Sequence, residues 1–410
     1  MDTLKLLYIA NLRLPTEKAY GIQIVKMCES FAMQKRGLTL TDTRTNAEEK
    51  NEVELVTPYR MNHIKEDIFD FYAIKINFKF TRIWAPDFYF PGKLDRTSVL
   101  LKDFISGIIL AFYGLVSKPD IIYSRDEWPL YFLSFFPTLT RKYGVVFEAH
   151  KFSSTKRFFY KRFKNKNLKV VVITGRLKED FIKNGFKPEN ILVASDGVDL
   201  EEFDINLSKE EARAKVGLPV DIKIVMYTGH LFEWKGADVL LEAARNFQFS
   251  SANWQTNFQK KEDILFVFVG GMDYDIKKFE EKARGLENVL ILGQKLHKEI
   301  PIYLKAADVL VLPNSAKEEM SRSYTSPLKL FEYMASGRPI IASGLPSIME
   351  ILNKENAVLV PPDDPVGLAG GIRAILDNST LGEELSKKSS ENVKQYTWGK
   401  RAQSIINFIG

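Results

Sequence analysis

The sequence is poor in cysteine. Its 410 residues include one, Cys28. A lone cysteine cannot form a disulfide within the chain, so nothing in the composition indicates an oxidising compartment. We therefore expect the protein to work in a reducing cytoplasm.

Long apolar runs are also lacking. The longest uncharged apolar stretch, 104–117, follows Lys102 and Asp103 and is shorter than the ~20 residues that span a bilayer. Met1 leads directly into "LKLLYIA", a strand-like segment without the basic, apolar and small-residue regions of a signal peptide. We expect neither a membrane span nor a signal peptide.

The sequence also has little excess charge of one sign. The net charge is +6, while 45% of residues are apolar and 27% are charged, a balance typical of folded globular proteins. So small an excess does not indicate nucleic-acid binding unless the charge is clustered. The length favours two domains.

Short β-branched runs alternate with longer helical patterns, which predicts an α/β protein with mostly parallel sheets. The polar segment 37–51 has no clear period and is interpreted as a surface insertion. The expected strands are 5–10, 52–57, 120–124, 145–149, 169–174 and 190–194, and then 223–228, 264–270, 288–292, 308–313, 339–342 and 357–360. The pattern restarts after "DGVDLEEF" (196–203), so we expect two doubly wound domains, with ligands at the carboxyl ends of the strands.

Two segments have the chemistry of an anion site. In "TGHLFEWKG" (228–236), Gly229 follows a strand and Lys235 precedes a helix, an arrangement suited to a diphosphate. The alternative is an ordinary turn with a solvated lysine. In "SYTSPLKLFEYMASGRPIIAS" (323–343), we expect Ser326 as the N-cap and Pro327 as the first helical residue. Glu332 could accept hydrogen bonds from both ribose hydroxyls, or it could be a solvated helix charge.

In order and spacing, the chain resembles the retaining glycosyltransferases of family 4, which have two Rossmann-like domains in the GT-B architecture. The segments that carry the resemblance are "RLPTEKAYGIQIVKMCESFA" (13–32), "IIYSRD" (121–126), "FEAH" (147–150), "VVITGRLKEDFIKNG" (171–185), "DGVDLEEF" (196–203), "GHLFEWKG" (229–236), "IPIYLKAADVLVLP" (300–313) and "LFEYMASGRPIIAS" (330–343). The resemblance implies an acceptor-binding domain over 1–197, a nucleotide-sugar-binding domain over 198–395, and a final helix, about 396–410, that returns to the first domain.

The resemblance also implies roles for individual residues. It assigns catalytic roles to His150 at the transferred sugar, Lys235 at the departing phosphates and Glu332 at the ribose. Gly21 would lie in a loop that lets the diphosphate approach. The other substrate-binding positions are Arg125, Gly229, His230, Tyr324, Thr325, Ser326, Pro327, Leu328 and Lys329.

Two positions depart from the family pattern. His230 stands where the family usually has an arginine, and Tyr324 where it has a glutamate that contacts the donor sugar. Either Glu318 or Glu319 replaces that acid, or the backbone of 325–328 takes over its contacts. We favour the backbone.

"MDYD" (272–275) contains the Asp-x-Asp pattern that binds a divalent metal in other glycosyltransferases. Aspartates after a strand and a Gly-Gly pair commonly cap the next helix. Lys235 and the helix dipole also supply the positive charge that a metal would bring. We expect no metal and no cofactor other than the nucleotide-sugar substrate.

Residues 151–169, "KFSSTKRFFYKRFKNKNLK", are basic, aromatic and without an acid. With "WPLYFLSFF" (128–136) they predict peripheral contact with an anionic membrane, on its cytoplasmic face. The alternative places the aromatics in the core and the lysines in solvent. We expect no nucleic-acid partner.

The leading hypothesis is a metal-independent hexosyltransferase. It would move a sugar, with retention, from a UDP- or GDP-sugar to a glycan, lipid-linked or small-molecule acceptor in cell-envelope polysaccharide or glycolipid synthesis. The alternatives are a sugar-nucleotide epimerase or phosphorylase on the same fold, or an inactive nucleotide-sugar-binding subunit.

Overall fold

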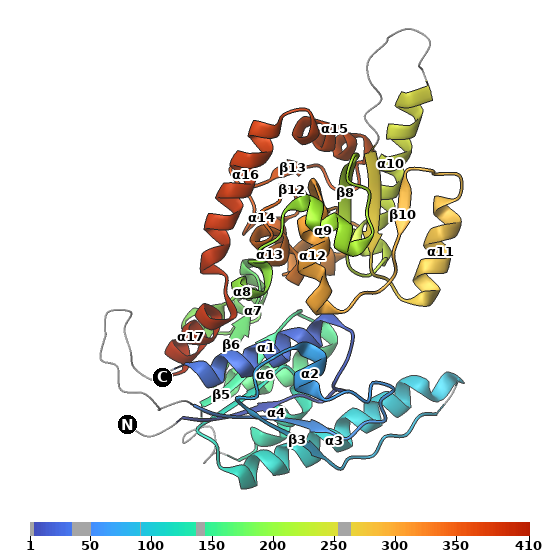
Figure 1. The fold of residues 1–410 in the computed structure, drawn as a ribbon. Helices are drawn as coiled ribbons and strands as arrows, with labels where there is room; N and C mark the ends of the chain where they lie inside the picture. The colour runs from blue at the N-terminus through green and yellow to red at the C-terminus, as the bar shows by residue number, and fades with distance from the viewer. Residues whose placement is uncertain (1–3, 35–50, 91, 137–143, 253–263) are drawn as a thin grey trace. The chain divides into compact units, whose positions relative to one another are not determined.

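The computed structural model describes residues 4–34, 51–90, 92–136, 144–252 and 264–410 (Figure 1). The chain divides into two compact units, Met1–Ser195 with Trp398–Gly410, and Asp196–Thr397. The sequence predicted that the first domain would end at residue 197, two residues after the boundary at Ser195. Nearly all of the expected surface insertion lies outside the described residues.

Unit 1 is built on a seven-stranded parallel sheet in the order β3-β2-β1-β4-β5-β6-β7. Its strands are β1 (Lys5–Ile9), β2 (Glu52–Pro58), β3 (Lys79–Ile83), β4 (Ile121–Ser124), β5 (Gly144–Ala149), β6 (Lys169–Val172) and β7 (Ile191–Val193). Its helices are α1 (Ala19–Met33), α2 (Ile68–Tyr72), α3 (Asp95–Ser117), α4 (Glu127–Leu133), α6 (Arg157–Asn165), α7 (Gly175–Lys183) and α17 (Trp398–Ile409). The last helix, α17, packs on α1 (Figure 1).

Unit 2 is built on a six-stranded parallel sheet in the order β10-β9-β8-β11-β12-β13. Its strands are β8 (Lys223–Thr228), β9 (Ile264–Val269), β10 (Val289–Ile291), β11 (Val309–Leu312), β12 (Ile340–Ser343) and β13 (Val358–Val360). Its helices are α8 (Leu200–Phe203), α9 (Lys209–Val216), α10 (Ala237–Ala252), α11 (Asp273–Ala283), α12 (Ile300–Ala306), α13 (Leu328–Ala335), α14 (Pro346–Met349), α15 (Pro365–Leu376) and α16 (Ser379–Asn392).

Both faces of the unit 2 sheet are covered. Alternate residues of β8 enter separate cores, Ile224 and Met226 on one side and Val225 and Tyr227 on the other. This explains why the strand reads as one apolar run, as is typical of parallel sheets between helices.

The expected strands all appear, with ends that differ by at most two residues. Strand β3 was not predicted from the sequence. Its residues, "KFTRI", are exposed or half-buried, since β3 lies at the edge of the sheet and needs no apolar run.

Two local expectations were wrong. Ser326 does not cap α13, because Pro327 is extended (ψ 126°) and no side chain caps the helix. The Ser326 hydroxyl instead accepts a hydrogen bond from the Asp196 backbone N–H at 3.0 Å. Gly21 lies within α1 rather than in a loop. A Cβ there would stand 2.1 Å from the Tyr72 hydroxyl, so close packing accounts for this glycine.

Candidate functional site

The unit 2 site lies where its strand order reverses, between β8 and β11, which is where doubly wound sheets bind ligands. Gly229 follows β8 with φ +122°, a conformation that favours glycine. Lys235 ends a short 3-10 turn, Glu233–Lys235. A Cβ on the next residue, Gly236, would stand 1.7 Å from the carbonyl oxygen of Pro313, which follows β11. The turn is therefore pressed against the end of the neighbouring strand.

Helix α13 is held against the same strand end. The Tyr333 hydroxyl accepts a hydrogen bond from the Thr228 backbone N–H at 2.8 Å. A single π-helical turn, Met320–Tyr324, precedes α13, and such turns are frequent at functional sites. The side chain of Lys329, the second residue of α13, would lie 3.9 Å from a Cβ on Gly229, so the amino end of α13 lies beside the Gly229 turn.

Lys329 is the most informative residue of this site. It is 7% exposed, and its Nζ has no hydrogen-bond acceptor in the described part of the chain. The Nζ lies 3.9 Å from the centre of the Tyr227 ring and would lie 3.9 Å from a Cβ on Gly229. Burial and the charge of Lys235 hold the pKa of Lys329 well below its usual range, although Glu332 opposes them. A buried amine without an acceptor is costly unless a ligand supplies one.

Lys235 and Glu332 belong to the same electrostatic cluster. Burial lowers the pKa of Lys235 to about 8, against the opposing charge of Glu332. The carboxylate of Glu332 is nearly buried, and its Oε1 lies 3.0 Å from the His297 Nε2. His297 was not singled out in the sequence, because its partner lies 35 positions away. The structure therefore brings Gly229, Lys235, Lys329 and Glu332 together.

The two positions that depart from the family pattern are partly enclosed. The His230 ring stacks on Phe232, with centroids 5.0 Å apart. Tyr324 is 7% exposed, and its hydroxyl lies 3.4 Å from the Glu319 Oε1. Glu318 and Glu319 are both exposed. Of the remaining predicted positions, Thr325 and Leu328 are buried and Pro327 is half-buried.

The Asp-x-Asp pattern that could bind a metal consists of Asp273 and Asp275. Both lie in the first turn of α11, where no side chain caps the helix. Among the described residues, no group of three or more His, Cys, Asp or Glu side chains is placed to hold a metal ion.

The unit 1 cluster surrounds a carboxylate that is fully buried. His150 follows β5, and its Nε2 lies 2.6 Å from the Glu148 Oε1. The same oxygen accepts hydrogen bonds from Gln23 at 2.6 Å and from Arg401 of α17 at 3.1 Å, and Tyr123 donates to Oε2. Burial alone would raise the pKa of Glu148, but Arg401 and His150 hold it well below its usual range.

His150 is held as a neutral imidazole by these surroundings. Burial and the nearby Arg125 guanidinium lower its pKa to about 4, despite the contact with Glu148. Because Glu148 is ionised, the Nε2–H of His150 donates to it, and Nδ1 remains the acceptor. Arg125 donates to the Gln23 Oε1 at 2.5 Å, so it belongs to the same network. Glu148 and Arg401 were missed because they lie far apart in the sequence.

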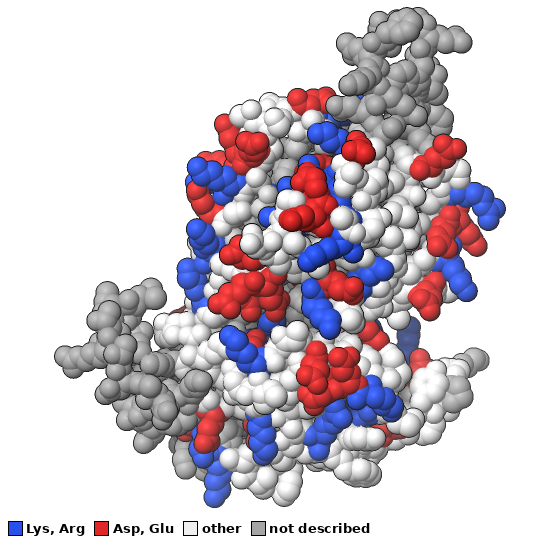
Figure 2. All heavy atoms as spheres, viewed as in Figure 1, with Lys and Arg blue, Asp and Glu red and all other residues white. Residues whose placement is uncertain are grey.

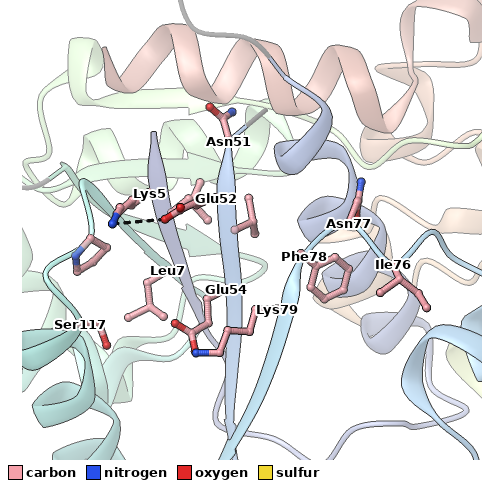
Figure 3. Close-up of a pocket in the computed structure, with 13 residues that line it drawn as sticks. Lys5, Leu7, Asn51, Glu52, Glu54, Ile76, Asn77, Phe78, Lys79 and Ser117 are labelled. Atoms are coloured by element: carbon pink, nitrogen blue, oxygen red, sulfur yellow. Dashed lines mark ion pairs between the residues drawn. The ribbon is translucent and has the colours of Figure 1, made fainter. Parts of the chain in front are cut away.

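A separate cavity of about 710 Å³ lies at the amino ends of β1, β2 and β3 (Figure 3). Its charged walls are paired, Lys5 with Glu52 at 3.4 Å and Lys79 with Glu54 at 3.0 Å. It lies at the opposite edge of the sheet from His150 and contains none of the predicted site residues.

The two Rossmann-like units define the GT-B fold, the architecture of the solved structures that the chain resembles. A solved structure from Anabaena, "Alr3699/HepE in complex with UDP and glucose", has a TM-score of 0.70 at 15% identity and covers 98% of each chain. Residues 222–378 match the family model described as "Glycosyl transferases group 1", and this part of unit 2 belongs to that family.

The similarity to curated relatives covers only part of each protein. The chain is 28% identical over 238 residues to the "Phosphatidyl-myo-inositol mannosyltransferase" of Mycobacterium leprae, covering 57% of this chain and 58% of that protein. It is 25% identical over 230 residues to the "D-inositol 3-phosphate glycosyltransferase 1" of Catenulispora acidiphila, covering 54% and 52%. The chain thus spans little more than half the length of these relatives.

Proposed function

We propose that the chain is a retaining, metal-independent glycosyltransferase that uses a nucleotide-diphosphate hexose as donor. The observation that carries this proposal is the buried amine of Lys329, which has no acceptor within the described residues. It lies beside the Gly229 turn and in the same charge cluster as Lys235. A diphosphate would supply acceptor oxygens for the Lys329 amine and further negative charge beside the two lysines.

Each residue of the cluster has a distinct part in the proposed reaction. Lys235, Lys329 and the amino end of α13 would stabilise the charge on the diphosphate as the glycosidic C–O bond breaks. Glu332, oriented by His297, would accept the ribose hydroxyls. The acceptor hydroxyl would form the new C–O bond on the same face of the sugar, and its proton would pass to the departing phosphate.

The donor and acceptor classes are drawn from similarity. One structural neighbour was solved with UDP and glucose, and the curated relatives are named for inositol-containing acceptors. We propose a UDP- or GDP-sugar donor and a lipid-linked, glycan or small polyol acceptor in cell-envelope synthesis. We place the protein in the cytoplasm, at the inner face of the membrane.

Lys329→Met tests the proposal, because stability and binding should change in opposite directions. Removing the unsatisfied amine should raise the free energy of unfolding by about 1–3 kcal/mol. The same change should weaken UDP-sugar or GDP-sugar binding about 10–100-fold, since a charged hydrogen bond is lost. Urea denaturation and calorimetric titration would measure the two effects.

Lys277→Met on exposed α11 is the matched control and should change neither quantity. Unchanged donor affinity in Lys329→Met would contradict the proposed site. Incubation with donor alone separates the alternatives, because an epimerase would alter the sugar and a transferase would not. Tight donor binding without transfer to any acceptor would indicate an inactive subunit.

A further inference from the structure

Helix α3 of unit 1 presents a long apolar face to solvent. It runs from Asp95 to Ser117, well beyond the uncharged stretch noted in the sequence. By length and composition it could cross a membrane, and only 28% of its most apolar 18-residue window is buried. The exposed apolar side chains are Val99, Leu100, Leu101, Phe104, Ile108, Phe112 and Val116. Five of them recur every four residues from 100 to 116, which places them along one side of the helix.

The opposite side of α3 is attached to unit 1. Its buried residues are mostly small: Ser98, Ser106, Gly107, Leu110, Ala111 and Gly114. A Cβ on Gly107 would stand 2.6 Å from the Cβ of Trp128 on α4, so the two helices are in close contact. Asn11 donates to Asp103 at 3.3 Å, and Arg60 donates to Ser106 at 2.8 Å. A helix held in this way cannot cross a bilayer without leaving its own domain, but it can lie along the surface of one.

Aromatic residues extend the face from α3 to α4 and α6. Phe104 contacts Trp128, with ring centroids 5.1 Å apart, and Trp128 contacts Phe158 at 5.9 Å. Tyr131 joins the same cluster, 5.2 Å from Phe135. Phe135 and Phe158 are about half exposed. Aromatic side chains of this kind favour the boundary between lipid and water.

The basic segment 151–169 adjoins this face, since its Phe158 contacts Trp128 and Tyr131. Phe159, Tyr160 and Phe163 of α6 are buried, as in the alternative that places the aromatics of this segment in the core, whereas Phe158 is exposed. Lys151, Arg157 and Lys161 are exposed and Lys166 is half-buried, and the segment contains no acid. Figure 2 shows acidic and basic side chains mixed across the viewed face, with mainly uncharged atoms at its lower edge.

We propose that the apolar face of α3 enters the surface of an anionic phospholipid bilayer, parallel to its plane, while the exposed basic residues of 151–169 contact the headgroups. Apolar insertion together with basic attraction is the combination that holds helices at membrane surfaces. Apolar patches of this extent are rarely left exposed on soluble monomers. A second copy is the weaker fit, because a two-fold contact through this face would bring two basic segments together.

Docking of α3 on a bilayer would also affect which acceptors the protein can reach. The inner side of α3 is hydrogen-bonded to Asn11, which follows β1, and the Asn11 backbone N–H donates to Asp126, which follows β4. These residues lie at the point where the order of the unit 1 sheet reverses. A docked α3 would therefore bring the carboxyl ends of these strands to the lipid surface, within reach of a lipid-linked substrate.

Vesicle flotation of the full chain tests the docking face. Wild-type protein should float with phosphatidylglycerol–phosphatidylcholine vesicles, and less with phosphatidylcholine alone. Leu100→Gln with Ile108→Gln and Phe112→Gln should reduce binding at least ~10-fold at low and high salt, because the inserted area is lost. Lys151→Gln with Arg157→Gln and Lys161→Gln should reduce binding about as much, but only at low salt.

The matched control replaces three exposed apolar residues of unit 2, Val220, Met349 and Val366, with Gln and should float like the wild type. Thermal unfolding should be similar for all variants, since the changed side chains are exposed. An α3 variant that floats normally, or a wild type that binds neither vesicle, would overturn the proposal. So would a wild-type dimer that the α3 changes convert to a monomer. Flotation uses neither donor nor acceptor, so its failure would remove the placement at the membrane but leave the proposed transfer reaction standing, and a failure of donor binding would leave the docking face standing.

Discussion

The two units bury charge in different ways. In unit 1, the Glu148 carboxylate receives hydrogen bonds from Gln23, Tyr123, His150 and Arg401. In unit 2, the Lys329 amine has no acceptor within the described residues. The first cluster is complete without a ligand, so it serves to hold His150 in place. The second sets two amines against the single carboxylate of Glu332 and leaves one amine without an acceptor, which is the property expected of a binding site.

Glu148→Gln should produce the largest effect of the three changes, a loss of stability. If stability did not fall, the contrast between the unit 1 and unit 2 clusters would be wrong. The change leaves Arg401 buried without its counter-ion, so the free energy of unfolding should fall by about 3–5 kcal/mol. Urea denaturation would measure it. Glu179→Gln on exposed α7 is the control, with an expected change within about 0.5 kcal/mol. A loss as small as that of the control would show that the unit 1 network does not stabilise the fold.

Lys235→Ala should affect catalysis rather than stability. Losing one group that stabilises charge in the transition state typically lowers turnover about 10²–10³-fold. The unfolding transition should be almost unchanged, because Lys235 is half-buried in a turn. Steady-state rates with saturating donor would measure the effect, with Lys277→Ala as the reference. Near-normal turnover would remove Lys235 from the proposed site.

The pH dependence of donor binding should be the smallest effect. The pKa of Lys235 is about 8, and only the protonated amine attracts a diphosphate. The protonated fraction falls from roughly nine-tenths at pH 7 to one-tenth at pH 9, so affinity should fall about tenfold. Calorimetric titration would measure it. Lys235→Arg should remove this fall, because a guanidinium stays charged over the range, and an equal fall in that variant would point to another group.

Local sequence patterns were enough to predict the fold of both units. Apolar runs such as 223–228 are short and end in glycine or polar residues, and parallel sheets between helices require this pattern. Strand β3, which was not predicted, is not an apolar run, and its residues are exposed or half-buried. Its position at the sheet edge removes the need for an apolar sequence.

The sequence predicted those site residues that lie in or near a recognisable turn or helix. Gly229 and Lys235 lie in the turn that follows β8, and Glu332 lies within α13; the sequence already outlines these elements. His297, Glu148 and Arg401 act through contacts between distant segments, which no local pattern records. Ser326 shows a further limit, because the hydroxyl that could cap α13 is taken by the Asp196 backbone.

The return of α17 to unit 1 affects the order in which the protein can mature. Arg401 is needed to balance Glu148, yet it leaves the ribosome about 250 residues later. Amino-terminal domains often fold during synthesis, whereas unit 1 can complete its interior only after unit 2 has been translated. A chain stalled or truncated before residue 401 would therefore present an unfinished unit 1 to chaperones and proteases.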